Sequence, residues 1–78
     1  AALDGSEEAA FQYLRQLRKT LADASGVPAY IVFSDKVLRE MVAQRPTSAS
    51  ELLDVPGVGP AKLEKYGSAF LSAIGELI

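Results

Sequence analysis

The chain has 78 residues, and its 10 acidic and 8 basic side chains give a formal net charge of −2. It contains no cysteine and no histidine, which excludes disulfides, thiolate chemistry and nearly all zinc sites, and removes the usual general base. These numbers predict one small domain without a cofactor, whose binding of nucleic acid would need a local basic patch.

The chain also lacks the marks of a membrane protein. No apolar run approaches the roughly 20 residues that a membrane-spanning helix needs, and no signal peptide is visible. We therefore expect no membrane partner. Because the chain begins at Ala1 and not with Met, we expect residues 1–78 to be a single domain cut from a longer protein.

A first helix is predicted over residues 6–25, with Asp4 or Ser6 as its cap and Gly26 as the residue that ends it. Its apolar residues recur with the 3.6-residue helical period, which predicts one buried stripe. The stripe consists of Ala10, Tyr13, Leu14, Leu17, Leu21 and Ala24.

The segment that follows, "VPAYIVF" at residues 27–33, is rich in β-branched and aromatic residues, as in a strand. No second strand is predicted anywhere, so we expect an extended connector that is not paired into a sheet. Alternation along it predicts that Ile31 and Phe33 are buried, with Tyr30 and Val32 on the other side. Tyr30 is expected to be at least partly exposed; the alternative is a buried ring whose hydroxyl bonds a backbone carbonyl.

A second helix is predicted to begin after the cap Ser34 and to stop at Pro46. Next, Ser48 and Glu51 have the spacing of a capping box, which predicts a short third helix. The apolar stripe of the second helix consists of Val37, Leu38, Met41 and Val42, and the short third helix carries Leu52 and Leu53.

The turn "VPGVGP" precedes a fourth helix over residues 61–66, with Pro60 at its first position. Gly67 is predicted to end that helix and residues 68–78 to form a fifth. Its inward residues are Phe70, Leu71, Ile74, Leu77 and Ile78. The predicted fold is all-α: a compact bundle of about five short helices with an extended hydrophobic connector between the first two.

The glycine turn is the first candidate binding feature. Gly57 and Gly59 let an anion approach the backbone before a helix that carries Lys62 and Lys65. This arrangement is similar to the helix-hairpin-helix turn that holds DNA phosphates. The alternative interpretation is a tight turn between two packed helices.

The second candidate is a set of basic residues on the helices that flank Tyr30. An aromatic ring can stack on a base while cations bind phosphates, as in single-stranded nucleic-acid binding. The alternative is an ordinary solvated surface. The set consists of Arg15, Arg18, Lys19, Lys36 and Arg39.

The acidic residues suggest no catalysis. The pairs Glu7–Glu8 and Glu51–Asp54 lie at helix starts or on exposed faces, where acids are ordinarily found. We therefore expect a domain that is not itself an enzyme.

Three stretches, "LRKTLADASGVPAYIVFSD", "PTSASELLDVPGVG" and "KLEKYG", resemble the HRDC domain, the helicase-and-RNase-D-C-terminal module, and most closely those of RecQ-type DNA helicases. The resemblance runs from Phe11 to Leu77. It implies a bundle of about five helices that is a monomeric accessory domain of an ATP-dependent DNA helicase. It also implies a bacterial, cytoplasmic location, with association to the nucleoid through the parent enzyme.

The resemblance implies a partner as well: single-stranded or branched DNA, bound weakly, with Tyr30 in the contact patch. Nearby basic residues belong to the same patch, namely Arg18, Lys19, Lys36 and Arg39. No ATPase residues carry over, because the chain has no phosphate-binding loop of the GxxxxGK type.

The chain departs from the resemblance in its charge, because DNA-binding members tend to be basic and this chain is acidic. An alternative is therefore a protein-interaction module that docks onto other domains of the parent helicase. A third reading is an accessory domain of an RNA-processing nuclease.

Overall fold

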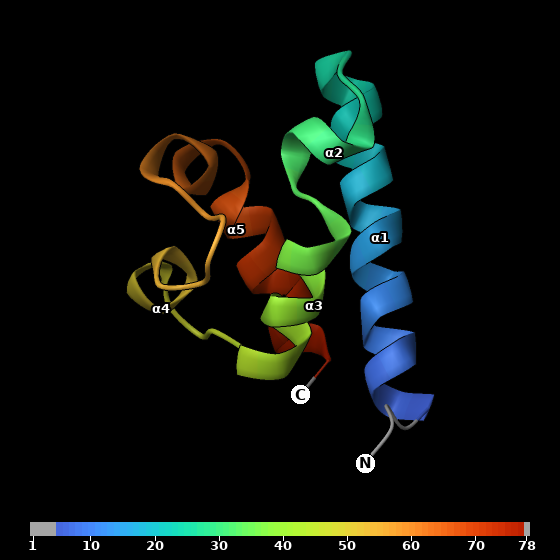
Figure 1. The fold of residues 1–78 in the computed structure, drawn as a ribbon, viewed down its shortest axis with the longest axis vertical. Coiled ribbons are helices and arrows are strands. Elements are labelled where there is room, and N and C mark those ends of the chain that lie inside the picture. The colour runs from blue at the N-terminus through green and yellow to red at the C-terminus, as the bar shows by residue number, and fades with distance from the viewer. Residues whose placement is uncertain (1–4, 78) are drawn as a thin grey trace.

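Five helices form the part of the chain that the computed structural model describes, residues 5–77 with side chains from Glu7 onward (Figure 1). No strand occurs in this part, so the predicted all-α fold is confirmed. The helices are α1 Gly5–Ser25, α2 Ala29–Val32, α3 Asp35–Gln44, α4 Ala49–Leu53 and α5 Pro60–Glu76. None of them is long and apolar enough to cross a membrane.

Helix α1 ends as its sequence predicts. Gly26 has a φ of 70°, the Val27 N–H donates to the Ala22 carbonyl over 3.0 Å, and the Gly26 N–H donates to the Asp23 carbonyl over 3.3 Å. These two bonds make up a Schellman motif. At the other end, the helix already includes Gly5, so Ser6 lies inside it and is not the cap. Asp4 lies outside the described residues.

The buried stripe of α1 is rotated from the predicted one. Tyr13 is 42% exposed and Ala24 is exposed, so their predicted burial is wrong. Helices α2 and α3 both pack along α1, so the covered face of α1 is the one turned toward these two helices. The buried residues of α1 are Ala10, Phe11, Leu14, Arg18 and Ala22, and Leu17 and Leu21 are half-buried.

The predicted extended connector contains a helical turn. Residues 27–33 are not paired into a sheet, as predicted, but Ala29–Val32 is helical and only its flanks, including Phe33, are extended. The Ile31 N–H donates to the Pro28 carbonyl over 3.0 Å, so a turn satisfies backbone groups that a lone strand would leave unpaired.

This turn changes which side chains of the connector point inward. Residues in a helix advance by about 100° each, not by the alternation assumed for an extended chain. Tyr30 is 70% and Ile31 42% exposed, whereas Val32 and Phe33 are buried. The predictions for Tyr30 and Phe33 are confirmed, and those for Ile31 and Val32 are wrong.

Both predicted caps of the middle helices are confirmed. Ser34 Oγ accepts from the Val37 N–H over 3.3 Å, and Ser48 Oγ accepts from the Glu51 N–H over 3.2 Å. Glu51 does not return a bond to Ser48, however; its carboxylate accepts from the N–H and hydroxyl of Thr47, over 2.7 and 2.8 Å. The Glu51 carboxylate therefore bonds Thr47, the residue before the cap, and not the backbone N–H of Ser48 as in a capping box.

The predicted apolar stripe of α3 is confirmed, because Val37, Leu38, Met41 and Val42 are buried. In α4, Leu52 is buried as well. Leu53 is 41% exposed, because α4 is a single short turn that shows only one side to the core.

The fourth and fifth predicted helices form one helix, α5, and Gly67 lies buried in its middle. A Cβ on Gly67 would lie 2.7 Å from Leu63 Cδ1 and 3.7 Å from Leu52 Cδ2. Gly67 therefore lies beneath the side chain of Leu63 in the same helix, which a Cβ would displace, and it does not end the helix. The predicted burial of Phe70 and Ile74 is confirmed, Leu71 and Leu77 are half-buried, and Ile78 lies outside the described residues.

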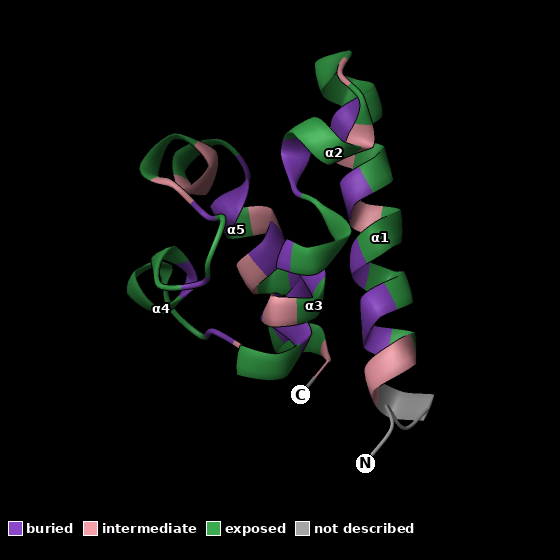
Figure 2. Cartoon of the chain, viewed as in Figure 1, coloured by how far each residue is buried: buried purple, intermediate pink, exposed green. Residues whose placement is uncertain are grey.

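The core lies where α1, α3 and α5 face one another, and the purple residues of Figure 2 follow these inner faces. Phe33 connects the connector to this core. Its ring makes edge-to-face contacts with Phe70, at a centroid distance of 5.1 Å, and with Tyr66, at 6.3 Å. The connector is therefore anchored at Phe33, while Tyr30 stays at the surface.

Candidate nucleic-acid interface

Tyr30 is a surface tyrosine on a firmly anchored turn. It is the most exposed large apolar side chain among the described residues, yet Val32 and Phe33, two and three positions on, are almost fully buried. A ring held in this way loses little freedom when it stacks on a flat partner, because its backbone is already fixed.

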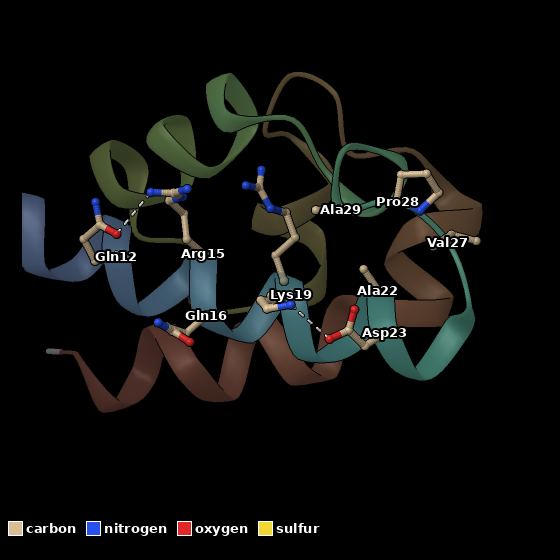
Figure 3. A pocket seen from close by; sticks show the side chains of 10 residues that line it. Gln12, Arg15, Gln16, Lys19, Ala22, Asp23, Val27, Pro28 and Ala29 are labelled. Atoms are coloured by element: carbon tan, nitrogen blue, oxygen red, sulfur yellow. Dashed lines mark hydrogen bonds and ion pairs between the residues drawn. The ribbon is translucent and has the colours of Figure 1, made fainter.

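A surface cleft of about 400 Å³ lies beside this turn, between α1 and the chain that leaves it (Figure 3). The α1 wall carries three cations, Arg15, Arg18 and Lys19. The opposite wall is formed by Val27, Pro28 and Ala29, and Tyr30 follows Ala29 directly. The structure therefore brings the predicted cations of α1 together next to the aromatic candidate.

Two of these cations are available to a ligand. Arg15 is exposed and donates to Gln12 Oε1 over 3.3 Å. Lys19 is exposed and pairs with Asp23 over 3.3 Å, one helical turn on, as the dashed line in Figure 3 shows. An exposed ion pair such as Lys19–Asp23 contributes at most about 1 kcal/mol, so a phosphate can replace Asp23 at small cost.

Arg18 is in a different state, because its side chain is buried. Nη1 lies 3.0 Å from the Phe33 carbonyl oxygen and 2.8 Å from Asp35 Oδ1. The structure turns its guanidinium toward the end of the connector. Its guanidinium is already bonded and is not free to meet a phosphate.

The two cations of α3 also differ. Lys36 is exposed in the first turn. Arg39 lies over the ring of Phe11, 3.8 Å from its centroid, and its guanidinium is 3.6 Å from Glu8. Arg39 thus joins α3 to α1, and its charge is partly balanced.

The glycine turn is tightly built. Gly57 has a φ of 94° and Gly59 a φ of −96°, so only Gly57 has the left-handed backbone that favours glycine. A Cβ on Gly57 would overlap Val37 Cγ2. This contact favours the structural interpretation, a turn that packs on α3. Pro60 takes the first position of α5 as predicted.

The two lysines after this turn lie near different rings. Lys62 is half-buried, with Nζ 5.8 Å from the centroid of Phe33, and Lys65 is exposed, with Nζ 5.4 Å from that of Tyr66. Because Phe33 ends the connector, Lys62 is the lysine of α5 that lies close to it.

A hydrogen bond with Ser25 lowers the pKa of the Tyr66 hydroxyl, and the charges of Lys62 and Lys65 lower it as well.

These positions define what we call the basic-aromatic patch: Tyr30, Arg15, Lys19, Lys36 and Lys62. Sequence reasoning missed two other residues of the cleft, Gln12 and Gln16. Their spacing of four, next to Arg15 and Lys19 on the same helix, is the signal that could have found them.

Among residues 5–77 no group of acidic side chains could hold a metal ion.

Comparison with known proteins supports the family resemblance. The sequence model of the HRDC domain matches residues 7–74. The ATP-dependent DNA helicase RecQ of Haemophilus influenzae is 48% identical over 66 residues, which are 85% of this chain and 11% of that protein. The ATP-dependent DNA helicase UvrD2 of Mycobacterium bovis is 40% identical over 73 residues, which are 94% of this chain and 10% of that protein.

A solved structure, HRDC domain 3 of the Deinococcus radiodurans RecQ protein, has the same fold with a TM-score of 0.87 and 34% identity. The match covers 91% of this chain and 93% of that domain. The chain thus corresponds to a whole domain of this type but spans only about a tenth of the length of the curated relatives.

Proposed function

Because the chain belongs to the HRDC domain family, we propose that it is a non-catalytic accessory domain of a bacterial RecQ-type DNA helicase. In this role it makes weak contact with single-stranded or branched DNA and tunes the choice of substrate. We propose further that it acts as a monomer and reaches the nucleoid through the longer protein. The greater identity to RecQ than to UvrD2 supports the RecQ type.

The exposure of Tyr30 is the observation that carries this proposal. Burying a large ring in the core is favourable, yet this ring lies at the surface although its neighbours Val32 and Phe33 are buried. A base stacked on an aromatic ring contributes about 1–3 kcal/mol and needs no particular sequence. Such contact fits a domain that meets many DNA sequences.

The cations of the basic-aromatic patch supply the second part of the contact. Arg15 and Lys19 line the cleft on one side of α2, and Lys62 lies against Phe33 at its other end. Lys36 follows in the first turn of α3. A strand whose base stacks on Tyr30 therefore has cations near it for its phosphates, although the domain as a whole is acidic.

Fluorescence anisotropy with a labelled single-stranded oligonucleotide tests the proposal. Tyr30→Ala should weaken binding by about 1–3 kcal/mol, roughly fivefold to 150-fold. Tyr30→Phe, the matched control, keeps the ring and should bind like the wild type. Both variants should keep the wild-type circular dichroism spectrum, because the ring is exposed. Absence of wild-type binding at low salt, or equal binding by Tyr30→Ala, would contradict DNA contact.

A second candidate function is supported by Ile31, which is 42% exposed beside Tyr30. An apolar pair on an acidic domain suits docking onto another domain of the longer protein. Ile31→Ser should then abolish binding to the longer protein that lacks residues 1–78, and should leave binding of single-stranded DNA unchanged. If Ile31→Ser has no effect on either, the docking function is wrong.

A further inference from the structure

Arg18 is the one charged residue among the described residues that is buried, with 8% of its surface exposed. We propose that it is a positioning residue: it fixes the turn that presents Tyr30 and does not itself bind phosphate. This inference rests on the proposed DNA contact, but its structural part can be tested without DNA.

The contacts of Arg18 tie α1 to the end of the connector. One nitrogen, Nη1, reaches both the carbonyl oxygen of Phe33 and Oδ1 of Asp35, the first residue of α3. A hydrogen bond from a charged donor is about twice as strong as a neutral one. The Phe33 carbonyl belongs to an extended residue between two helices, so no helical N–H is in place to bond it.

Stability alone does not explain a buried arginine at this position. Its Nε is buried and has no hydrogen-bond partner among the described residues, and an unsatisfied buried donor is costly. Its partner Asp35 is largely exposed, and ion pairs that are open to solvent contribute little to stability. An apolar side chain of similar size at position 18 would fill the same space but would not hold the Phe33 carbonyl in place.

Helix α2 needs such an anchor because it is only four residues long. A single helical turn is unstable by itself, since nucleation costs more than one hydrogen bond returns. On its N-terminal side the Schellman motif at Gly26 and Val27 fixes the chain to α1. On its C-terminal side Arg18 performs the same task, and Tyr30 lies between the two anchors.

The charge of Arg18 separates this role from phosphate binding. A cation that neutralises a phosphate releases counterions. When such a cation is removed, the slope of log K against log salt for single-stranded DNA becomes shallower by about 0.7. Arg18 is buried, and its Nη1 already bonds the Phe33 carbonyl and Asp35, so it should not contact a phosphate and its loss should not change that slope. Lys19 is exposed in the same cleft and is the matched phosphate-binding control.

The DNA arm compares Arg18→Met with Lys19→Met by anisotropy over a salt series. Arg18→Met should weaken binding about fivefold or more, the loss of one stacked base, with the wild-type salt slope. Lys19→Met should make the slope of log K against log salt shallower by about 0.7. Arg18→Lys, which retains a charged donor, should recover part of the affinity. A reduced slope for Arg18→Met would overturn the proposal, because it would mean direct phosphate contact.

The DNA-free arm measures amide hydrogen exchange. Arg18→Met should accelerate exchange at residues 29–35 while the amides of α5 stay protected. Leu17→Ala, a control that weakens the packing of α1 on the core, should accelerate exchange throughout. Unchanged exchange at residues 29–35 would overturn the proposal. If Arg18→Met does not fold, Arg18→Lys, which has a single donor group in place of the guanidinium, decides the same question: exchange at residues 29–35 should be faster than in the wild type.

The two arms keep the failures apart. If the wild-type chain does not bind DNA but Arg18→Met loosens the turn, the DNA contact is wrong and the anchoring of the connector stands. If the wild type binds DNA and Arg18→Met neither loosens the turn nor weakens binding, the DNA contact stands and the role of Arg18 is wrong.

Discussion

Gly57 and Gly59 lie two positions apart in one turn, yet the structure constrains them differently. Gly57 has a φ of 94°, and any Cβ there would overlap Val37 Cγ2. Gly59 has a negative φ, and no atom lies within 4 Å of the place where its Cβ would be. At the scale of the residue, the "GVG" of the turn therefore contains one obligatory glycine and one that can be replaced.

We predict that Gly57→Val destabilises the chain by more than about 1 kcal/mol, from strain at positive φ and the clash with Val37. Gly59 caps α5, and serine is a better cap than most residues, so Gly59→Ser should be neutral or slightly stabilising. Urea denaturation of both variants measures the difference. Equal stability of the two would show that the turn does not require Gly57.

Arg39 and Lys36 look equivalent in the sequence, but only Arg39 has defined partners, the Phe11 ring and Glu8. Arg39→Ala should destabilise the chain by about 0.5–1 kcal/mol, the usual value of an exposed cation–π contact. Lys36→Ala should stay within about 0.5 kcal/mol of the wild type. Urea melts of the two variants test this, and a larger loss for Lys36→Ala would contradict it.

At the scale of the element, α4 is a five-residue helix that depends on the contacts at its first turn. Glu51 accepts two hydrogen bonds from Thr47, and the bond from the Thr47 N–H contributes most to a lowered pKa of its carboxyl group. A lowered folded-state pKa means that the stabilisation is complete above the ordinary glutamate value of 4.5 and is lost as pH falls through the folded-state value.

We therefore predict that Glu51→Gln lowers the free energy of unfolding at neutral pH, and that its difference from the wild type shrinks as the solution is acidified below about pH 4.5. Urea melts at a series of pH values measure this difference. Glu64→Gln, at an exposed position of α5, is the control. A difference between Glu51→Gln and the wild type that does not change with pH would contradict the role of the carboxylate.

The whole molecule is acidic, with a formal charge of −2, yet Arg15 and Lys19 line the cleft beside the connector and Lys62 lies near Phe33. Net charge therefore opposes DNA binding while the local patch favours it. A domain with this balance should bind weakly, with a dissociation constant of about 1 μM or weaker, and few phosphates should take part.

We predict a shallow salt dependence for the complete chain. If Arg15, Lys19, Lys36 and Lys62 each neutralise one phosphate, the slope of log K against log salt for a single strand is about −2.8. Anisotropy between low and physiological salt measures it. A substantially steeper slope would mean that further cations, such as Lys65 or Arg39, contact the strand.

Local chemistry alone determined much of this protein. The caps Ser34 and Ser48, the end of α1 at Gly26 and the first position of α5 at Pro60 were predictable, because each depends on residues a few positions away. The apolar period of α3 likewise identified its buried face. The family motifs in the sequence were long enough to identify the domain.

The tertiary structure decided what depends on distant residues. Gly67 lies inside one continuous helix beneath the Leu63 side chain. The strand-like residues 29–32 form a helical turn, and residues 5–77 contain no strand that could pair with them. Arg18 carries a charge that the sequence assigns to the surface, but packing turned it inward to the Phe33 carbonyl and Asp35. Neighbouring residues set helix caps, whereas only the packed chain determines which side of a helix is covered and which cation is already bonded.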